Sequence, residues 1–227
     1  MSARRSLLWP TLFAAAGVSV LLGLGGWQVQ RLQWKEELIA EIVARRAAEP
    51  LAALPMTVDP ALEFRRVALS GRFLHDKEIR LQSRTRGGSS GVELVTPLVL
   101  VDGTVVLVNR GWVPAAKAEP AARPETRGGG EARIEGLVRL GERLGWATPV
   151  NKPDQGLWFA AVPMAIAEAA GVAAAPYLVV VEGESGALPR PRPPAALPAN
   201  DHLSYALTWF ALAGVLIVVY VAWRRRA

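Results

Sequence analysis

LLWPTLFAAAGVSVLLGLGGW, residues 7–27, is an uncharged apolar run of 21 residues close to the start of the chain. A second run of the same length, LSYALTWFALAGVLIVVYVAW at residues 203–223, lies near the end. At a rise of about 1.5 Å per residue, each run would be roughly 31 Å long as a helix, which matches the hydrocarbon thickness of a bilayer. The two runs therefore predict two transmembrane helices and a membrane-anchored protein.

Arginines flank the outer end of each apolar run. Arg4 and Arg5 precede the first run, and Arg224 to Arg226 follow the second. Because basic flanks stay on the cytoplasmic side, both termini are predicted to be cytoplasmic and the middle of the chain to be exported. A cleaved signal peptide is the alternative for the first run, but GWQVQR at residues 26–31 offers no small-x-small cleavage site.

The basic excess of the chain is local. The formal net charge is +6, but five of the 26 basic residues are the terminal arginines, so residues 28–202 carry 21 basic against 20 acidic side chains. A nearly neutral domain is a poor binder of nucleic acid, so no nucleic acid is expected as a partner and the tails are read as contacts with membrane lipid. The chain has no cysteine, which excludes disulfides and thiolate chemistry.

The exported part, residues 28–202, is long enough for one folded domain. Alternating apolar residues favour strands there, so the fold class is predicted to be membrane-anchored α+β, with two transmembrane helices flanking one mainly β extracytoplasmic domain. The predicted order is cytoplasmic residues 1–6, transmembrane helix 7–27, helical stalk 28–48, β-rich body 62–183, proline-rich tether 188–199, transmembrane helix 203–223 and cytoplasmic residues 224–227.

One hairpin is the firmest local expectation within the β-rich body. Residues 92–101 and 104–108 flank Asp102-Gly103, the dipeptide preferred in a type I′ turn. Residues 84–91 are expected to form a polar loop, and residues 114–130, rich in Ala, Pro, Glu and Gly, an exposed excursion that tolerates deletions. Further strands are expected at residues 67–73, 78–81, 132–140, 157–161 and 177–181, and a short helix at 164–170.

The start of the second apolar run carries the main candidate site. His202, Tyr205 and Trp209 are spaced i, i+3 and i+7, so a helix would present an imidazole, a phenol and an indole on one face. One interpretation is an interfacial collar, because Tyr and Trp favour the headgroup level. The other is a haem site, in which His202 is the axial ligand of the iron and the aromatic residues form a wall.

A weaker candidate lies in NRGWVP at residues 109–114. Arg110 is suited to bind a propionate or a partner's carboxylate, and Trp112 to cover an apolar ligand. The structural alternative is that Trp112 fills the core and Arg110 caps a sheet edge. With only two histidines, His75 and His202, the sequence shows no catalytic metal cluster and no phosphate loop, and no enzyme is predicted.

Four motifs resemble those of the Surfeit locus protein 1 family: GWQVQR at 26–31, TPL at 96–98, LVNRGWVP at 107–114 and NDHLSY at 200–205. The similarity spans almost the whole chain and includes the order of the motifs. The resemblance implies an assembly factor for haem–copper oxidases, chiefly cytochrome c oxidase, that acts around insertion of haem a into the large subunit. It implies two partners, that subunit and the haem a synthesis machinery, and it favours haem at His202.

Two functions follow from the resemblance, a chaperone that holds haem a and a scaffold for oxidase subunits without haem. The basic stretch before the first run is short and has no transit-like character, so a bacterial plasma (inner) membrane is expected, with the main domain periplasmic. The two spans are expected to pack antiparallel, with small residues meeting at the same depth near their midpoints: Gly17 beside Ala16 in the first span, and Ala213 beside Gly214 in the second.

Overall fold

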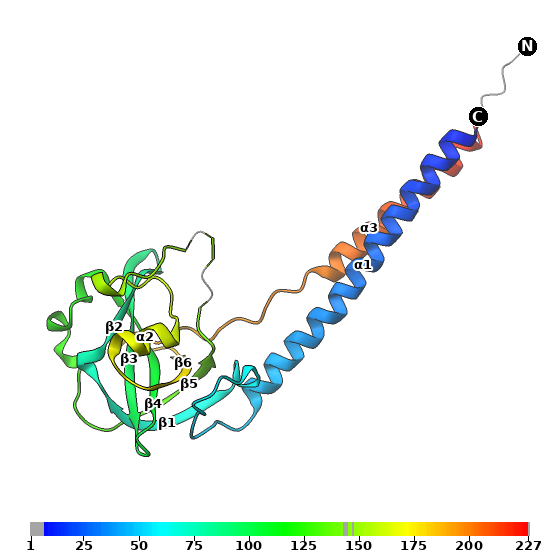
Figure 1. Cartoon of the computed structure of the whole chain (residues 1–227). Helices are drawn as coiled ribbons and strands as arrows, with labels where there is room; N and C mark the ends of the chain where they lie inside the picture. The colour runs from blue at the N-terminus through cyan, green and yellow to red at the C-terminus, as the bar shows by residue number, and fades with distance from the viewer. Residues whose placement is uncertain (1–6, 143–144, 147, 227) are drawn as a thin grey trace, which may run out of the picture. The chain divides into compact units, whose positions relative to one another are not determined.

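The computed structural model describes residues 7–142, 145–146 and 148–226. The predicted cytoplasmic segment 1–6, with Arg4 and Arg5, lies outside these residues. The chain forms two compact units, a helical unit of Met1–Glu41 with Leu197–Ala227 and a β-rich unit of Ile42–Ala196. Figure 1 shows the elements of each unit.

The helical unit contains all of the apolar helix α3 (His202–Arg224) and most of the apolar helix α1 (Leu8–Ala47), whose residues from Ile42 on belong to the β-rich unit. The predicted span 7–27 and stalk 28–48 are thus one continuous helix of 40 residues. Both helices are long and apolar enough to cross a membrane, and only 6% and 11% of their apolar windows are buried. Neither is therefore the covered core helix of a soluble domain, because a core helix would bury most of its apolar surface.

The two helices run antiparallel, as expected from the sequence (Figure 1). Thr11 Oγ1 lies 2.5 Å from Tyr220 OH at one end, and Gly25 packs on the Phe210 ring nearer the other. The expected contact of small residues at the midpoints is confirmed for Gly17 and for Ala213, which is 1% exposed, and is wrong for Gly214. A Cβ on Gly17 would lie 3.0 Å from Leu216 Cδ2, whereas Gly214 has no atom within 4 Å of that position and faces away from α1.

The β-rich unit is a six-stranded sheet in the order β1-β5-β6-β4-β3-β2, and an additional β1–β3 pairing closes it into a barrel. The β4–β6 pair is parallel and the other pairs are antiparallel. Long β3 makes the closure possible, because its first half pairs with β2 and its last residues pair with β1. The strands are β1 (Arg66–Phe73), β2 (Ile79–Arg86), β3 (Ser89–Leu100), β4 (Val105–Pro114), β5 (Ala132–Arg139) and β6 (Ala174–Val181).

The expected β3–β4 hairpin is confirmed, but its turn type was predicted wrongly. Only Gly103 has positive φ, and its N–H donates to the Leu100 carbonyl at 3.0 Å. This is a type I turn followed by a left-handed glycine, because a type I′ turn needs positive φ at both central residues. That condition is met instead at Gly87 and Gly88, with φ of 55° and 77°. The expected loop 84–91 is therefore a second tight hairpin, between β2 and β3.

Strands β4 and β6 are apolar on both faces, which explains why their sequences read as nearly continuous apolar runs. Alternate residues enter two clusters. Val106, Val108 and Tyr177 belong to the first, in the barrel interior, and Leu107 and Leu178 to the second. The second cluster also contains Ile166 and Ala167 of α2 (Pro163–Ala170), so this short helix covers the outer face of the sheet.

The expected stop of α2 at Gly171, with φ of 59°, is confirmed. Residues 157–161, expected as a strand, make only isolated bridges at Leu157 and Trp158.

The expected exposed excursion at 114–130 packs against the barrel, contrary to the sequence interpretation. It folds into three short 3-10 turns, η3 (Ala115–Lys117), η4 (Pro120–Ala122) and η5 (Pro124–Thr126). The Arg123 side chain is fully buried and forms an ion pair with Glu78, which lies beside β2. A buried arginine holds the segment in place because its charge has a carboxylate partner and its other donors are hydrogen-bonded.

The proline-rich segment 188–199 is also less free than expected. Arg190 forms a β-bridge with Trp112 of β4, and Arg192 forms one with Glu182. The first part of the predicted tether is thus docked on the β-rich unit, which ends at Ala196.

Candidate functional site: a histidine at the start of α3

Helix α3 begins at His202, with Asp201 at the N-cap position. The Asp201 side chain makes no capping hydrogen bond, and its carbonyl instead accepts from Ser204 Oγ at 2.7 Å. At about 100° per residue, His202, Tyr205 and Trp209 lie within roughly 60° of one another around the helix, which is the predicted stripe. His202 and Trp209 are half-buried beside the α1 contact, and Tyr205 is 56% exposed on its rim.

The imidazole of His202 has one hydrogen-bond partner among the described residues. His202 Nδ1 lies 2.7 Å from Oε1 of Gln28, which is a buried residue of α1. An amide oxygen only accepts, so the ring donates from Nδ1, and a neutral imidazole in this tautomer has its lone pair on Nε2. Within residues 7–142, 145–146 and 148–226, no hydrogen bond to Nε2 is found.

This arrangement fits one axial ligand of a haem iron. A neutral imidazole binds iron through the nitrogen that keeps its lone pair, and a carbonyl group typically holds the other ring N–H. Exposed Tyr205 and half-buried Trp209 provide apolar surface beside it. Both ring nitrogens of His75 contact other groups, Arg110 and the Gly128 carbonyl, and the described residues include no metal-type cluster of three His, Cys, Asp or Glu. His202 would therefore be the single protein imidazole available to the iron.

Arg110, a weaker candidate, is used inside the β-rich unit. It is the extra residue of a β-bulge between β3 and β4. Its guanidinium lies 3.4 Å from Glu78 Oε2 and 4.8 Å from the Phe73 ring, and it donates to the Thr126 carbonyl. Burial lowers the pKa of Arg110, and the charge of Glu78 opposes that change. These contacts favour the structural interpretation of Arg110, because they leave few donors for a propionate.

Trp112, the other weaker candidate, is a core residue. It is 5% exposed, and its Nε1 donates to the Arg84 carbonyl at 3.1 Å. Its backbone exchanges two hydrogen bonds of 2.8 Å with Arg190. Gly111 lets this segment approach, since a Cβ there would lie 2.1 Å from the Arg190 carbonyl oxygen. Both features favour the structural interpretation of the 109–114 motif.

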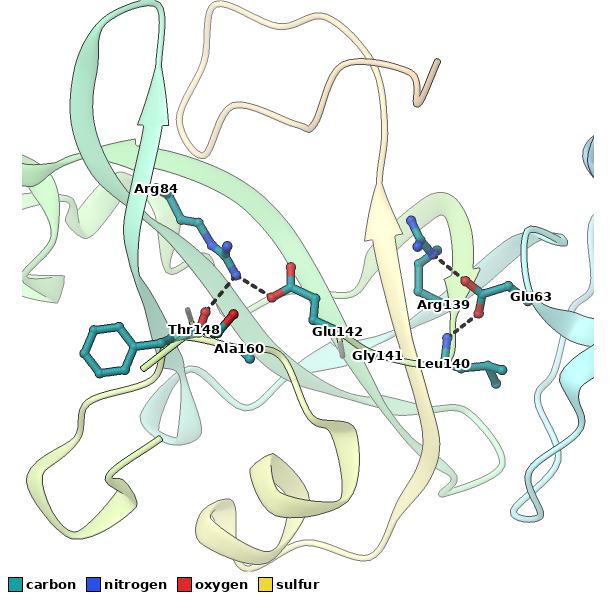
Figure 2. A pocket seen from close by; sticks show the side chains of 9 residues that line it. Glu63, Arg84, Arg139, Leu140, Gly141, Glu142, Thr148 and Ala160 are labelled. Atoms are coloured by element: carbon teal, nitrogen blue, oxygen red, sulfur yellow. Dashed lines mark hydrogen bonds and ion pairs between the residues drawn. The ribbon is translucent and has the colours of Figure 1, made fainter. Parts of the chain in front are cut away.

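A separate cavity of about 670 Å³ opens at one end of the barrel. Figure 2 shows two ion pairs in its wall: Arg84 Nη2 lies 2.6 Å from Glu142 Oε2, and Arg139 Nε lies 2.7 Å from Glu63 Oε1. Burial alone would raise the pKa of Glu142, but Arg84 and a hydrogen bond from Ala161 N–H lower it overall. Glu142 is therefore a charged structural partner at neutral pH and is unsuited to donate a proton.

The sequence interpretation missed Gln28 as a site residue. Gln28 lies 174 positions from His202. Its signals were a polar side chain immediately after an apolar run and its place within the GWQVQR motif. Neither signal names His202 as its partner, because that pairing depends on how α1 and α3 pack.

The chain is therefore a β-barrel protein with two apolar helices long enough to cross a membrane, and the second helix begins at a histidine bonded to a glutamine amide. The SURF1 family model matches residues 15–214, which include both Gln28 and His202. A SURF1-like protein of Monosiga brevicollis is 37% identical over 231 residues, covering 91% of this chain and 84% of its own. The chain belongs to the SURF1 family.

Vertebrate members show the same extended similarity. Surfeit locus protein 1 of Homo sapiens is 36% identical over 218 residues, covering 84% of this chain and 69% of its own. The protein of that name from Takifugu rubripes is 32% identical over 227 residues, covering 88% and 90%. The similarity therefore includes the helical unit as well as the barrel.

Proposed function

We propose that this chain is a membrane-anchored assembly factor for a haem–copper oxidase, chiefly cytochrome c oxidase, and that it assists insertion of haem a into the large subunit. Membership of the SURF1 family supports the assembly role. The observation that carries the haem role is the His202 imidazole, whose Nδ1 is bonded to Gln28 and whose Nε2 is left for a ligand. Its partners would be the large subunit and the machinery that makes haem a.

His202 would hold haem a as cargo, with Tyr205 and Trp209 packing against the macrocycle. When bound, the haem supplies an iron that accepts the Nε2 lone pair. A single imidazole would suit transient holding, because His202 would be the one protein group to release when the haem is passed on. The chain's own residues orient the ring and cover part of the apolar macrocycle. No catalytic step is required of them, so the proposed role is non-enzymatic.

The two apolar helices support the membrane anchor. Their side chains are largely unburied in the protein, and lipid is the solvent that would cover them. Arg224 to Arg226 at the end of α3 favour a cytoplasmic C-terminus and a periplasmic barrel in a bacterial inner membrane. The continuous run of α1 to Ala47 and its packing on α3 support a retained anchor over a cleaved signal peptide.

Single-cysteine labelling tests this topology, because the chain has no cysteine of its own. Glu184→Cys places a thiol on an exposed loop of the β-rich unit, and Arg226→Cys places one beyond α3. We expect a membrane-impermeant maleimide to label intact spheroplasts at position 184 and not at position 226. Labelling with the opposite pattern would reverse the proposed orientation.

The alternative function is a scaffold for oxidase subunits that binds no haem. The optical spectrum of full-length protein purified from a haem-a-producing host separates the two. We expect haem bands in the wild type and their loss in His202→Ala at similar protein abundance. Tyr205→Phe should weaken haem binding by altering the aromatic wall. Ser204→Ala, which removes an exposed hydroxyl bonded to the Asp201 carbonyl, is the control and should retain the bands. Absence of haem bands from the wild type would favour the scaffold, and equal bands in the wild type and His202→Ala would reject His202 as the ligand.

A further inference from the structure

We propose that Gln28 is the positioning residue of the haem site, and that its amide holds His202 in the Nδ1–H tautomer so that Nε2 faces the iron. The inference rests on the proposed function, because it concerns the same imidazole. Gln28 Oε1 lies 2.7 Å from His202 Nδ1, and Gln28 is only 9% exposed. A buried side-chain amide without a partner is costly, so the contact is strongly favoured on both sides.

The tautomer decides which nitrogen can bind a metal. A neutral imidazole has one N–H and one lone pair, and in water it exchanges them between its two nitrogens. An acceptor fixed beside Nδ1 selects the form with the lone pair on Nε2, fixes the ring plane and makes Nε2 more basic. Gln28 is neutral, so it provides these effects without adding a charge beside the membrane.

Small residues bring the two helices close enough for this contact. Gly25, one turn before Gln28 on α1, packs directly on Phe210, and a Cβ there would lie 2.5 Å from the ring. Ala206, one turn after His202 on α3, is buried. The close approach at this level allows a glutamine to reach the imidazole directly, without a bridging water.

The competing explanation is that the Gln28–His202 hydrogen bond merely holds the helices together. The chain offers a matched control for that explanation in the Thr11–Tyr220 hydrogen bond, which joins the same two helices with an oxygen to oxygen distance of 2.5 Å. Thr11→Val removes this interhelical bond near the far end of the pair. It should affect helix packing and leave the imidazole unchanged.

The binding experiment titrates full-length protein in detergent with ferric haem a. We expect Gln28→Leu to weaken haem binding about 10- to 100-fold, the usual cost of losing the group that orients a metal ligand. Gln28→Glu should retain binding and lower the midpoint reduction potential, because a carboxylate makes the ligand more electron-donating. Thr11→Val should bind haem with the wild-type Kd and spectrum.

A haem-free readout tests the tautomer directly. The chain has only two histidines, so 15N-histidine labelling gives two ring systems that NMR can distinguish. His202 should carry its proton on Nδ1. His75 is an internal reference for the other tautomer. Its Nε2 faces the Gly128 carbonyl oxygen and its Nδ1 faces Arg110, so His75 should carry its proton on Nε2. Gln28→Leu should convert His202 alone to a tautomer mixture.

The outcomes separate this inference from the proposed function. Wild-type Kd and spectrum in Gln28→Leu, or a proton on His202 Nε2 in the wild type, would overturn the role of Gln28 and leave haem binding by His202 intact. Equal losses in Gln28→Leu and Thr11→Val would reduce Gln28 to a packing residue and overturn it too. Unchanged haem binding in His202→Ala would overturn both proposals.

Discussion

Arg192 and Glu93 lie 99 positions apart in the chain, and the guanidinium donates two hydrogen bonds to the carboxylate, from Nε to Oε1 at 2.7 Å and from Nη2 to Oε2 at 2.5 Å. Arg192 belongs to the proline-rich segment and Glu93 to the middle of β3. The same Arg192 Nη2 lies 3.1 Å from Glu142. Burial lowers the pKa of Arg192, but its bonds to these two carboxylates raise the pKa overall. The Arg192–Glu93 ion pair therefore holds the proline-rich segment against β3.

Removing this ion pair should destabilise the β-rich unit. Arg192→Met leaves a nearly buried carboxylate without its main partner, and we expect a loss of about 3 kcal/mol, at the low end for breaking a buried pair because Arg192 is partly exposed. Thermal unfolding of the full chain in detergent, followed by near-UV circular dichroism, measures the change. Arg66→Ala, which breaks the exposed Arg66–Glu135 pair, is the control and should cost under about 1 kcal/mol. Equal losses in the two variants would contradict the bidentate pair.

Arg123 should be required for the packing of residues 115–130. Its guanidinium is buried and bonded to Glu78, Thr126 Oγ1 and the Lys117 carbonyl. We expect Arg123→Met to cost about 3 to 5 kcal/mol and to expose Lys117 to trypsin, because Glu78 loses one of its two arginines. Asp76→Ala breaks the exposed Asp76–Arg127 pair of the same segment and is the control. Wild-type resistance to trypsin in Arg123→Met would show that other contacts hold the segment.

Local patterns in the sequence predicted the elements but not the contacts between them. The apolar runs of α1, α3 and β4 and the alternation in β1 and β5 can each be recognised within one segment. The type of each turn was harder to predict from the sequence, because Asp102-Gly103 suits both a type I′ turn and a type I turn with a glycine bulge. The register of β3 and β4, set by the rest of the barrel, selects the second.

Long-range pairings explain the remaining errors and omissions. The composition of residues 114–130 predicted an exposed segment. It could not show that Arg123 is buried, because the burial of Arg123 depends on its ion pair with Glu78, 45 positions earlier. His202 was found from its spacing along one helix, whereas Gln28 is defined by contact with another helix. Side chains that act across two elements therefore need the tertiary structure for their assignment.

Acidic pH should weaken the barrel through His75. Burial and the neighbouring charge of Arg110 lower the pKa of His75 from the ordinary 6.5. As the pH falls through 6.5, the unfolded chain binds a proton that the folded ring resists, so folding stability is lost below that pH and is fully present above it. We expect the melting temperature of the wild type to fall more between about pH 7.5 and 5.5 than that of His75→Gln, which keeps hydrogen-bonding groups without titrating. Parallel curves for the two proteins would contradict this role.

The contact between α1 and α3 should depend on which face of each helix a glycine occupies. A side chain at Gly25 would collide with Phe210, one at Gly17 would press on Leu216, and one at Gly214 would meet open space. We therefore expect Gly25→Leu to separate the helices most, Gly17→Leu less, and Gly214→Leu not at all. Dipolar coupling between nitroxide labels attached at Thr11→Cys and Tyr220→Cys, introduced together into each variant, measures the separation of the two helices. Because Gln28 lies one turn from Gly25, Gly25→Leu should also release His202 from its Nδ1–H tautomer, and Gly214→Leu should not. Equal label separation in all three variants would show that the helices do not meet along the Gly17–Gly25 face.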